Sequence, residues 1–361
     1  MKLCFLAASN SIHSYKWIKY FADCGHEVYW ISAVSSSFDI PNNVKYFELN
    51  INTKFIDALS ATYKVRKIVS EIQPDILHVH YVGIYALLGL FSGAKQIVST
   101  PWGSDVIEGK KSIVKRWIVS RILHKSKMIT CDAYHMRNEV MNFGIHSDRI
   151  RIINFGIDTE RFSKQEKNKD LLDKFGISNE LSIVSLRNFE PVYDIKTLIF
   201  AAKIVLKENS NVRFILLGRG TLEDELKALV RDLGIDGSVC FTGFVDNQLL
   251  PSLLSSMDIY VSTSLSDAGI ASSTAEAMAC ETPVVISDSA ENDKWVNNED
   301  NGFLFSTKNH KRLAGILVKL LQDEALRKKV GKEGRNVIVQ NNDYENEMNK
   351  VNNLYIELSK T

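Results

Sequence analysis

Residues 259–287 read IYVSTSLSDAGIASSTAEAMACETPVVIS, and this stretch decides the fold class. An apolar run at Ile259–Ser262 is typical of a buried strand, and the apolar spacing over Ser273–Ala279 is typical of a helix. A second apolar run follows at Pro283–Ser287. A strand, a helix and a strand in this order form a βαβ unit, so the stretch predicts parallel strands joined by a helix.

The same alternation continues along the C-terminal half of the chain. We expect three earlier strands, at Ser182–Leu186, Arg213–Leu217 and Val239–Thr242. The helices expected here are Lys196–Lys207, Leu222–Leu233, Leu249–Ser255 and, toward the end of the chain, Leu313–Leu321, Glu324–Gln340 and Glu345–Leu358. Strands that alternate with helices in this way predict a doubly wound α/β domain.

The N-terminal half repeats the pattern and predicts a second sheet. The expected strands are Lys2–Ala8, Val28–Ile31, Ile76–His80, Ile97–Thr100, Met128–Cys131 and Ile150–Ile153. The first expected helix, Tyr15–Asp23, lies between the first two of these strands. The charged run SKQEKNKD at 163–170 separates the two series. We therefore predict domains at 1–162 and 163–340, with a last helix, 341–361, that crosses back onto the first domain.

The composition excludes several classes of protein. Of 361 residues, 45% are apolar and 24% are charged, which is too apolar for a disordered chain. A net charge of +1 gives no overall field for nucleic acid. The five cysteines are scattered without a CxxC pair, which argues against a disulfide framework or a zinc site. With no signal-peptide core at the start, we expect a cytoplasmic protein.

One uncharged stretch, 76–94, has the length of a membrane span at 19 residues. It contains two histidines and three glycines. We interpret it as a buried strand, Ile76–His80, followed by a tightly packed helix, Ile84–Phe91.

The start of the helix near Ser272 is a candidate anion site. Ser272, Ser273 and Thr274 offer hydroxyls there, and the unpaired N–H groups and dipole of a helix start favour an anion such as a diphosphate. Glu276, one turn inside, can accept hydrogen bonds from ribose hydroxyls, and Asp267 can contact a sugar. The alternative is an ordinary capped helix with a solvated glutamate.

Three further loops follow strands of the same predicted sheet. Arg187 can clamp a phosphate in bidentate fashion, or it is a surface arginine. The glycines of Gly218-Arg219-Gly220 permit a tight turn close to a ligand, although a lone GxG is weak evidence. The TGFV segment at 242–245 can present backbone groups to a base, or it is a plain turn.

These motifs, in this order, resemble the retaining glycosyltransferases of family 4, the group 1 glycosyltransferases. The motifs are NFGID at 154–158 with Arg161-Phe162, Arg187 with Glu190-Pro191, GRG at 218–220, TGFV at 242–245 and EAMACETPVV at 276–285. The resemblance spans the chain. It implies the GT-B fold, in which two Rossmann-like domains face each other across a ligand cleft.

The resemblance also implies an activity, the transfer of a sugar from a nucleoside diphosphate sugar to a hydroxyl of a glycan or lipid-linked acceptor. We favour a UDP-sugar, used in surface polysaccharide, lipopolysaccharide or glycolipid biosynthesis. The nucleotide sugar is a substrate, so no cofactor is expected, and the absence of a DxD triplet agrees with the metal-independent chemistry of the family. Arg187 then binds the diphosphate and Glu276 the ribose.

The candidate residues form three groups. The expected catalytic residues are Arg187, Asp267, Glu276 and His80. The expected donor-binding residues are Arg187, Gly218, Arg219, Gly220, Gly243, Phe244, Asp267, Gly269, Ile270, Ala271, Ser272, Ser273 and Glu276. The expected acceptor-side residues are Asn10, Ser11, His13, Trp102 and Asp105.

Three departures from the family pattern bear on these roles. The first acid of the family's acidic pair falls on Ala268, and Asp267 lies one residue earlier. The lysine that follows the family's arginine is missing, with Tyr193 or Asp194 in its place. Trp102 stands where many members have a histidine, so His80 or His13 are candidates for part of that role.

The acceptor-side residues have structural alternatives. His13 either lines the acceptor site or caps a helix. Trp102 and Asp105 form either a sugar platform with a hydroxyl acceptor, or a core tryptophan with a capping carboxylate.

The segment 109–128, GKKSIVKRWIVSRILHKSKM, predicts a basic amphipathic helix. Such a helix can lie on an anionic membrane, which suits a lipid-linked acceptor. Alternatively, its apolar stripe packs into the first domain. A non-catalytic nucleotide-sugar-binding subunit and a GT-B sugar-nucleotide epimerase remain alternatives for the whole protein.

Overall fold

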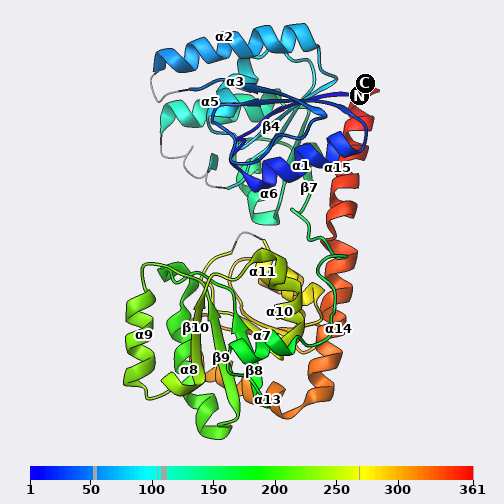
Figure 1. Cartoon of the computed structure of the whole chain (residues 1–361). Helices are drawn as coiled ribbons and strands as arrows, with labels where there is room; N and C mark the ends of the chain where they lie inside the picture. The colour runs from blue at the N-terminus through cyan, green and yellow to red at the C-terminus, as the bar shows by residue number, and fades with distance from the viewer. Residues whose placement is uncertain (52–54, 104, 107–111, 268, 361) are drawn as a thin grey trace. The chain divides into compact units, whose positions relative to one another are not determined.

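The computed structural model describes residues 1–51, 55–103, 105–106, 112–267 and 269–360. Its internal contacts divide the chain into two compact units (Figure 1). Unit 1 comprises Met1–Phe155 and Glu345–Thr361, and unit 2 comprises Gly156–Tyr344. Every strand pair in the described parts of both sheets is parallel, as the sequence predicts.

Unit 1 is built on a sheet of seven described strands in the order β3-β2-β1-β4-β5-β6-β7. The strands are β1 (Lys2–Leu6), β2 (Glu27–Ser32), β3 (Val44–Glu48), β4 (Ile76–His80), β5 (Ile97–Thr100), β6 (Met128–Cys131) and β7 (Ile150–Ile152). The helices are α1 (Ile12–Asp23), α2 (Phe55–Ile72), α3 (Ile84–Phe91), α5 (Ile113–Lys125), α6 (Tyr134–Met141) and α15 (Tyr344–Ser359). The chain changes direction across the sheet between β1 and β4, where ligands of such sheets usually bind.

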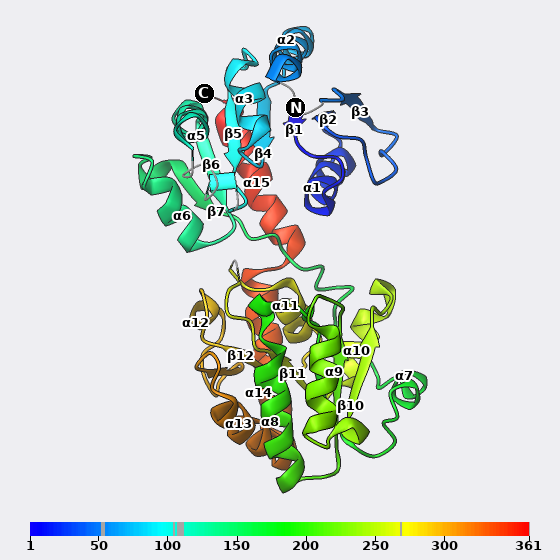
Figure 2. The same ribbon diagram turned by 90° about the vertical axis from the view of Figure 1, so that its left-hand side faces the viewer.

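Helices cover both faces of this sheet (Figure 2). On one face, Leu6 and Leu77 belong to a buried cluster with side chains of α2, α3 and α5. Because successive residues of a strand point to opposite faces, Phe5 and His78 face the other way. There they contact Phe21 of α1 and Tyr355 of α15.

The C-terminal helix α15 packs as part of unit 1. Its Met348, Val351 and Tyr355 are buried. The Tyr355 hydroxyl hydrogen-bonds to His78 Nδ1, and the Tyr20 hydroxyl of α1 donates to Asn349 at 3.0 Å. The last segment of the chain is therefore needed to complete the core of the first unit.

The boundary between the units differs from the expected positions, 162 and 340. It falls at Phe155/Gly156 and Tyr344/Glu345 because Ile157 bridges to Asp343, with N–H···O distances of 2.8 Å from Ile157 to Asn342 and 2.9 Å from Tyr344 to Ile157. Gly156 has a φ of +76°, and a Cβ there would lie 2.6 Å from Tyr344 Cα. Only glycine suits this close approach.

Unit 2 is built on a sheet of six described strands in the order β10-β9-β8-β11-β12-β13. The strands are β8 (Leu181–Ser185), β9 (Val212–Leu217), β10 (Val239–Gly243), β11 (Ile259–Ser262), β12 (Val284–Ser287) and β13 (Phe303–Phe305). The helices are α7 (Lys169–Lys174), α8 (Ile195–Glu208), α9 (Glu223–Asp232), α10 (Leu250–Ser256), α11 (Ser272–Ala279), α12 (Asn292–Trp295), α13 (His310–Gln322) and α14 (Glu324–Asn341).

The two faces of the second sheet carry separate cores. Side chains of α8, α9 and α13 form one cluster with Phe214 and Val261, and side chains of α10 and α11 form the other with Ile215 and Tyr260. Unit 2 is therefore doubly wound, as predicted. The switch point of its strand order lies between β8 and β11.

The uncharged stretch 76–94 is confirmed as strand β4 followed by helix α3. No described helix is long and apolar enough to cross a membrane. The five cysteines are all free thiols.

Candidate functional site

Arg187 follows β8 at the switch point of unit 2, and its side chain is 11% exposed. Its guanidinium forms an ion pair with Asp267 and donates to Ser273 Oγ at 3.4 Å. The ring of Tyr193 lies 4.3 Å below the guanidinium carbon. The buried Nε has no hydrogen-bond partner among the described residues, which is unusual for a buried donor.

The N-terminus of α11 lies beside this guanidinium. Its N-cap is Ala271, and no side chain in the described residues caps its first turn. Ser273 Oγ lies 2.8 Å from the hydroxyl of buried Tyr260, which fixes the serine next to Arg187. An arginine and an uncapped helix N-terminus are the two groups that proteins use most directly to bind phosphate.

Two more loops meet at the same edge of the sheet. The Gly218 N–H donates to the Gly243 carbonyl at 3.0 Å, and the Phe189 N–H donates to the Arg219 carbonyl at the same distance. These bonds join the loops after β8, β9 and β10. Phe244, at the tip of the last of them, is 72% exposed. The structure thus brings together Arg187, Asp267, Ser273 and the GRG turn.

Gly218 packs too closely on Arg187 to accept a side chain. Its φ is +148°, and a Cβ would lie 2.7 Å from the Arg187 carbonyl oxygen. We expect Gly218→Ala to lower the free energy of unfolding by about 1–3 kcal/mol. The matched control is Gly315→Ala, because Gly315 lies in α13 with open space around its Cα. Denaturant unfolding of both variants measures the difference, and equal stability of the two would contradict it.

The remaining donor-side residues lie along the same loop and helix. Glu276 is half-buried one turn inside α11 and shares a helix face with Ser272. Gly269 has a φ of +67°, and Ile270 and Ala271 lead from it into the helix. Ala268, the position shifted against the family pattern, lies outside the described residues.

In unit 1, aromatic rings gather at the carboxyl ends of β1, β4 and β5. The His13 ring lies 4.4 Å from Phe155 and 5.8 Å from Trp102. The centre of the His80 ring lies 4.8 Å from that of Trp17 and 5.8 Å from that of Trp102. The structure therefore brings together His13, His80 and Trp102, three residues that the sequence singled out.

His80 is buried, and neither ring nitrogen has a hydrogen-bond partner among the described residues. Burial, with a smaller contribution from His13, lowers the pKa of His80 from 6.5 to about 3. Burial also lowers the pKa of His13, and Lys16 adds to that shift. His80 is therefore a neutral imidazole near pH 7, suited to hydrogen bonding and not to acting as a cation.

The other acceptor-side candidates have structural roles or remain exposed. Asp105 is buried and accepts backbone N–H groups from Val82 at 2.6 Å and Trp102 at 3.1 Å, so its carboxylate holds two loops of unit 1 together. Ser11 is the N-cap of α1 and accepts from the Ser14 N–H, so His13 is not the cap. Asn10 is exposed in the same loop.

Sequence reasoning missed two sets of residues. Tyr260 supports Ser273, and only its place in β11 pointed to it. In unit 1, an open hollow of 550 Å³ beside the start of α1 is lined by Tyr15, Ser36, Ser37, Phe38 and Asp39. The rings of Tyr15 and Phe38 lie 5.1 Å apart. These residues could have been found from the sequence because they follow β1 and β2, at the edge of the sheet where ligands usually bind.

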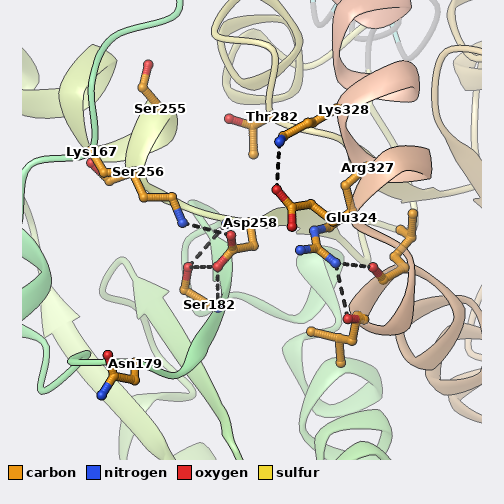
Figure 3. Close-up of polar contacts among 12 residues, drawn as sticks. Lys167, Asn179, Ser182, Ser255, Ser256, Asp258, Thr282, Glu324, Arg327 and Lys328 are labelled. Carbon is orange, nitrogen blue, oxygen red and sulfur yellow. Dashed lines mark hydrogen bonds and ion pairs between the residues drawn. The ribbon is translucent and has the colours of Figure 1, made fainter.

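A charged hollow of 450 Å³ lies at the opposite edge of the unit 2 sheet, where β8, β11 and β12 begin (Figure 3). Asp258 accepts from the Ser182 N–H at 2.8 Å and pairs with Lys167 at 2.9 Å. Glu324 pairs with Lys328 at 2.6 Å, and Arg327 donates to two backbone carbonyls of α13. These charged groups therefore bind one another and the backbone of unit 2 at the ends where β8, β11 and β12 begin.

Comparison with known proteins agrees with this geometry. The family described as "Glycosyl transferases group 1" matches residues 167–337, and "Glycosyl transferase 4-like" matches residues 2–133. The chain belongs to the group 1 glycosyltransferases. It is 25% identical over 335 residues to the N-acetyl-alpha-D-glucosaminyl L-malate synthase of Bacillus anthracis. The aligned region covers 88% of this chain and 85% of that protein.

Two further relatives of this group 1 glycosyltransferase are informative. The phosphatidyl-myo-inositol mannosyltransferase of Mycolicibacterium smegmatis is 25% identical over 314 residues, covering 84% of this chain and 79% of that one. The structure of Anabaena HepE in complex with UDP superposes with a TM-score of 0.83 at 18% identity, over 99% of this chain and all of that one. The GT-B fold predicted from the sequence is confirmed.

Within the described residues, the glycosyltransferase has no group of three or more His, Cys, Asp or Glu side chains placed to hold a metal ion. Arg187 and the start of α11 contribute positive charge at the candidate site.

Proposed function

We propose that the protein is a retaining, metal-independent glycosyltransferase that moves a sugar from a nucleoside diphosphate sugar to a hydroxyl of a glycan or lipid-linked acceptor. A UDP-sugar is the favoured donor. The reaction serves surface polysaccharide or glycolipid biosynthesis on the cytoplasmic side of the membrane, where the acceptor would be held at the lipid surface.

The observation that carries this proposal is Arg187, part-buried against Asp267 and Ser273 beside the start of α11, which no described side chain caps. A departing diphosphate gains negative charge, and preoriented donors stabilise that charge without reorganising during the reaction. Asp267 holds the guanidinium beside the start of α11, where it can bind a phosphate oxygen. Glu276 then accepts hydrogen bonds from the ribose.

Retention of configuration follows if the acceptor attacks from the face that the diphosphate leaves. In that arrangement the departing phosphate oxygen takes the proton of the acceptor hydroxyl, so no separate base is required. His80 is neutral, as a base must be, but it is buried away from an incoming acceptor hydroxyl. Arg187 and the helix dipole would bear most of the charge stabilisation.

Comparisons support the finer points. HepE was solved with UDP and with UDP-glucose, and it shares the whole fold. The mannosyltransferase relative is named for a phosphatidyl-myo-inositol acceptor. HepE supports a UDP donor, and the mannosyltransferase supports an acceptor at a lipid surface.

A thermal-shift panel of UDP-, GDP-, ADP- and dTDP-sugars with excess EDTA tests the proposal. We expect one nucleotide class to stabilise the protein, by about 2.7 kcal/mol at a hundred times its Kd. The responding sugar is then incubated with lipid and glycan acceptors, and transfer is measured together with the anomeric configuration of the product.

Each alternative function gives a different result in this experiment. Binding without transfer or slow hydrolysis would indicate a non-catalytic subunit. Conversion of the sugar nucleotide without acceptor would indicate an epimerase. Loss of transfer in EDTA would show that a metal ion is required.

A further inference from the structure

The N-terminal half of helix α5 projects from unit 1 with its apolar side chains in solvent. Ile113, Val114 and Trp117 are 91%, 66% and 48% exposed. All five residues from 113 to 117 are exposed, so the described residues leave this end of the helix largely uncovered. Exposed apolar side chains clustered in this way usually mark a binding surface.

The other end and the inner face of α5 hold the helix in place. Val119, Ile122 and Leu123 are buried in the unit 1 core. Lys125 Nζ donates to the Leu90 carbonyl at 2.5 Å, and Arg149 donates to the His124 carbonyl at 2.9 Å. The buried residues of α5 therefore lie on a different face, and Ile113, Val114 and Trp117 remain exposed to solvent.

The formal charges along residues 112–127 all have one sign. Residues 112–127 include five lysines and arginines and no aspartate or glutamate. Arg121 lies on the outward face four residues from Trp117, and its guanidinium carbon is 5.4 Å from the tryptophan ring. Lys110 and Lys111, also part of the predicted basic helix, lie outside the described residues.

We infer that the exposed tip of α5, formed by Ile113, Val114 and Trp117 with Lys115 and Arg121, docks onto the surface of an anionic lipid bilayer. The apolar side chains enter the boundary between headgroups and acyl chains, a position that tryptophan favours. The basic side chains bind lipid phosphates. The basic side chains are complementary to anionic lipid. An exposed isoleucine at the same place favours a lipid surface over nucleic acid, because Ile113, which is 91% exposed, can be buried among acyl chains.

This inference deepens the proposed function by giving the enzyme a surface for meeting a lipid-linked acceptor. It depends on that function only for its biological purpose. Binding to vesicles is measured without donor or acceptor, so the docking surface and the transferase activity can fail independently.

The test is flotation of the full-length protein with vesicles of phosphatidylcholine alone or with an equal part of phosphatidylglycerol. We expect binding only to the anionic vesicles, weakened at about 0.5 M salt because the lipid charge is screened. The triple variant I113S/V114S/W117S should lower the partition coefficient at least tenfold. The charge reversal K115E/R121E should do the same at low salt.

Matched controls alter similar side chains elsewhere. V339S/I356S removes two exposed apolar side chains from α14 and α15, and K311E/R312E reverses two exposed charges on α13. Both should bind vesicles like the wild type. Brominated phosphatidylglycerol should quench wild-type fluorescence, and W117F should remove much of that quenching.

The inference is overturned if the wild type does not bind anionic vesicles, or if the triple variant binds as well as V339S/I356S. It is also overturned if the α5 variants impair binding to RNA or self-association while vesicle binding stays absent. Those outcomes would assign the tip of α5 to nucleic acid or to a second copy of the chain.

Discussion

Replacing Arg187 by alanine is expected to lower kcat/KM for the nucleotide sugar by about 10²–10³-fold, the usual loss when a preoriented donor to a developing anion is removed. The reason is that Arg187 is a part-buried cation beside the start of α11, and its Nε has no hydrogen-bond partner among the described residues. Donor binding by calorimetry and transfer by product formation both measure the effect. Arg312→Ala, which removes an exposed arginine from α13, should leave both unchanged.

A second variant separates this role from a structural one. Arg187→Ala leaves Asp267, whose side chain is 5% exposed, as an unpaired buried charge, which costs about 3–5 kcal/mol in comparable cases. The double variant R187A/D267N removes both charges and should recover most of the stability. If it also recovers donor affinity, the pair is structural and the phosphate-binding role is wrong.

The interior strands could be predicted closely from the sequence. Ile76–His80, Ile97–Thr100, Met128–Cys131 and Ile259–Ser262 have the predicted bounds. These strands are buried along their length, so each appears in the sequence as a short, mainly apolar run without formal charge. A pattern imposed by burial on both faces does not depend on distant partners.

The edge strands β3 and β13 could not be predicted in the same way. β3 at Val44–Glu48 is partly exposed and alternates weakly, and β13 at Phe303–Phe305 has three residues. The predicted position of the unit boundary differs from the observed one for a related reason. The charged run at 163–170 resembles a linker, but Lys164 donates to the Ser255 carbonyl at 2.9 Å and Asn168 N–H donates to Ser256 Oγ at 2.8 Å. Those partners lie about ninety residues away in the chain.

The candidate site was predictable to the level of a shared sheet edge. Arg187 and Asp267 follow strands that prove to be neighbours, so their proximity was expected. Their ion pair was not, because contact between residues 80 apart depends on loop conformation. The same holds for Asp105, whose backbone partners come together only after β4 and β5 pair.

The histidines buried in unit 1 should make its stability depend on pH. The pKa of His80 is about 3 in the folded protein and about 6.5 when unfolded, so between these values only the unfolded chain binds the proton. Stability is then highest above pH 6.5 and falls as the pH drops, by about 1.4 kcal/mol per pH unit and about 5 kcal/mol in total from His80. Burial also lowers the pKa of His78, which adds to the loss in the same direction.

Denaturant unfolding between pH 7 and pH 4 measures this dependence, followed by tryptophan fluorescence. Four of the five tryptophans, Trp17, Trp30, Trp102 and Trp117, belong to unit 1, so the signal reports mainly on that unit.

His80→Phe should reduce the slope of stability against pH, since it removes the proton that the unfolded chain gains. His146→Gln, which alters a histidine whose side chain is 81% exposed, should keep the full slope. Carboxylates that titrate in this range contribute equally to both variants, so the difference in slope belongs to His80. If His80→Phe keeps the wild-type slope, His80 is not the buried neutral group described here, and the acid sensitivity of unit 1 has another source.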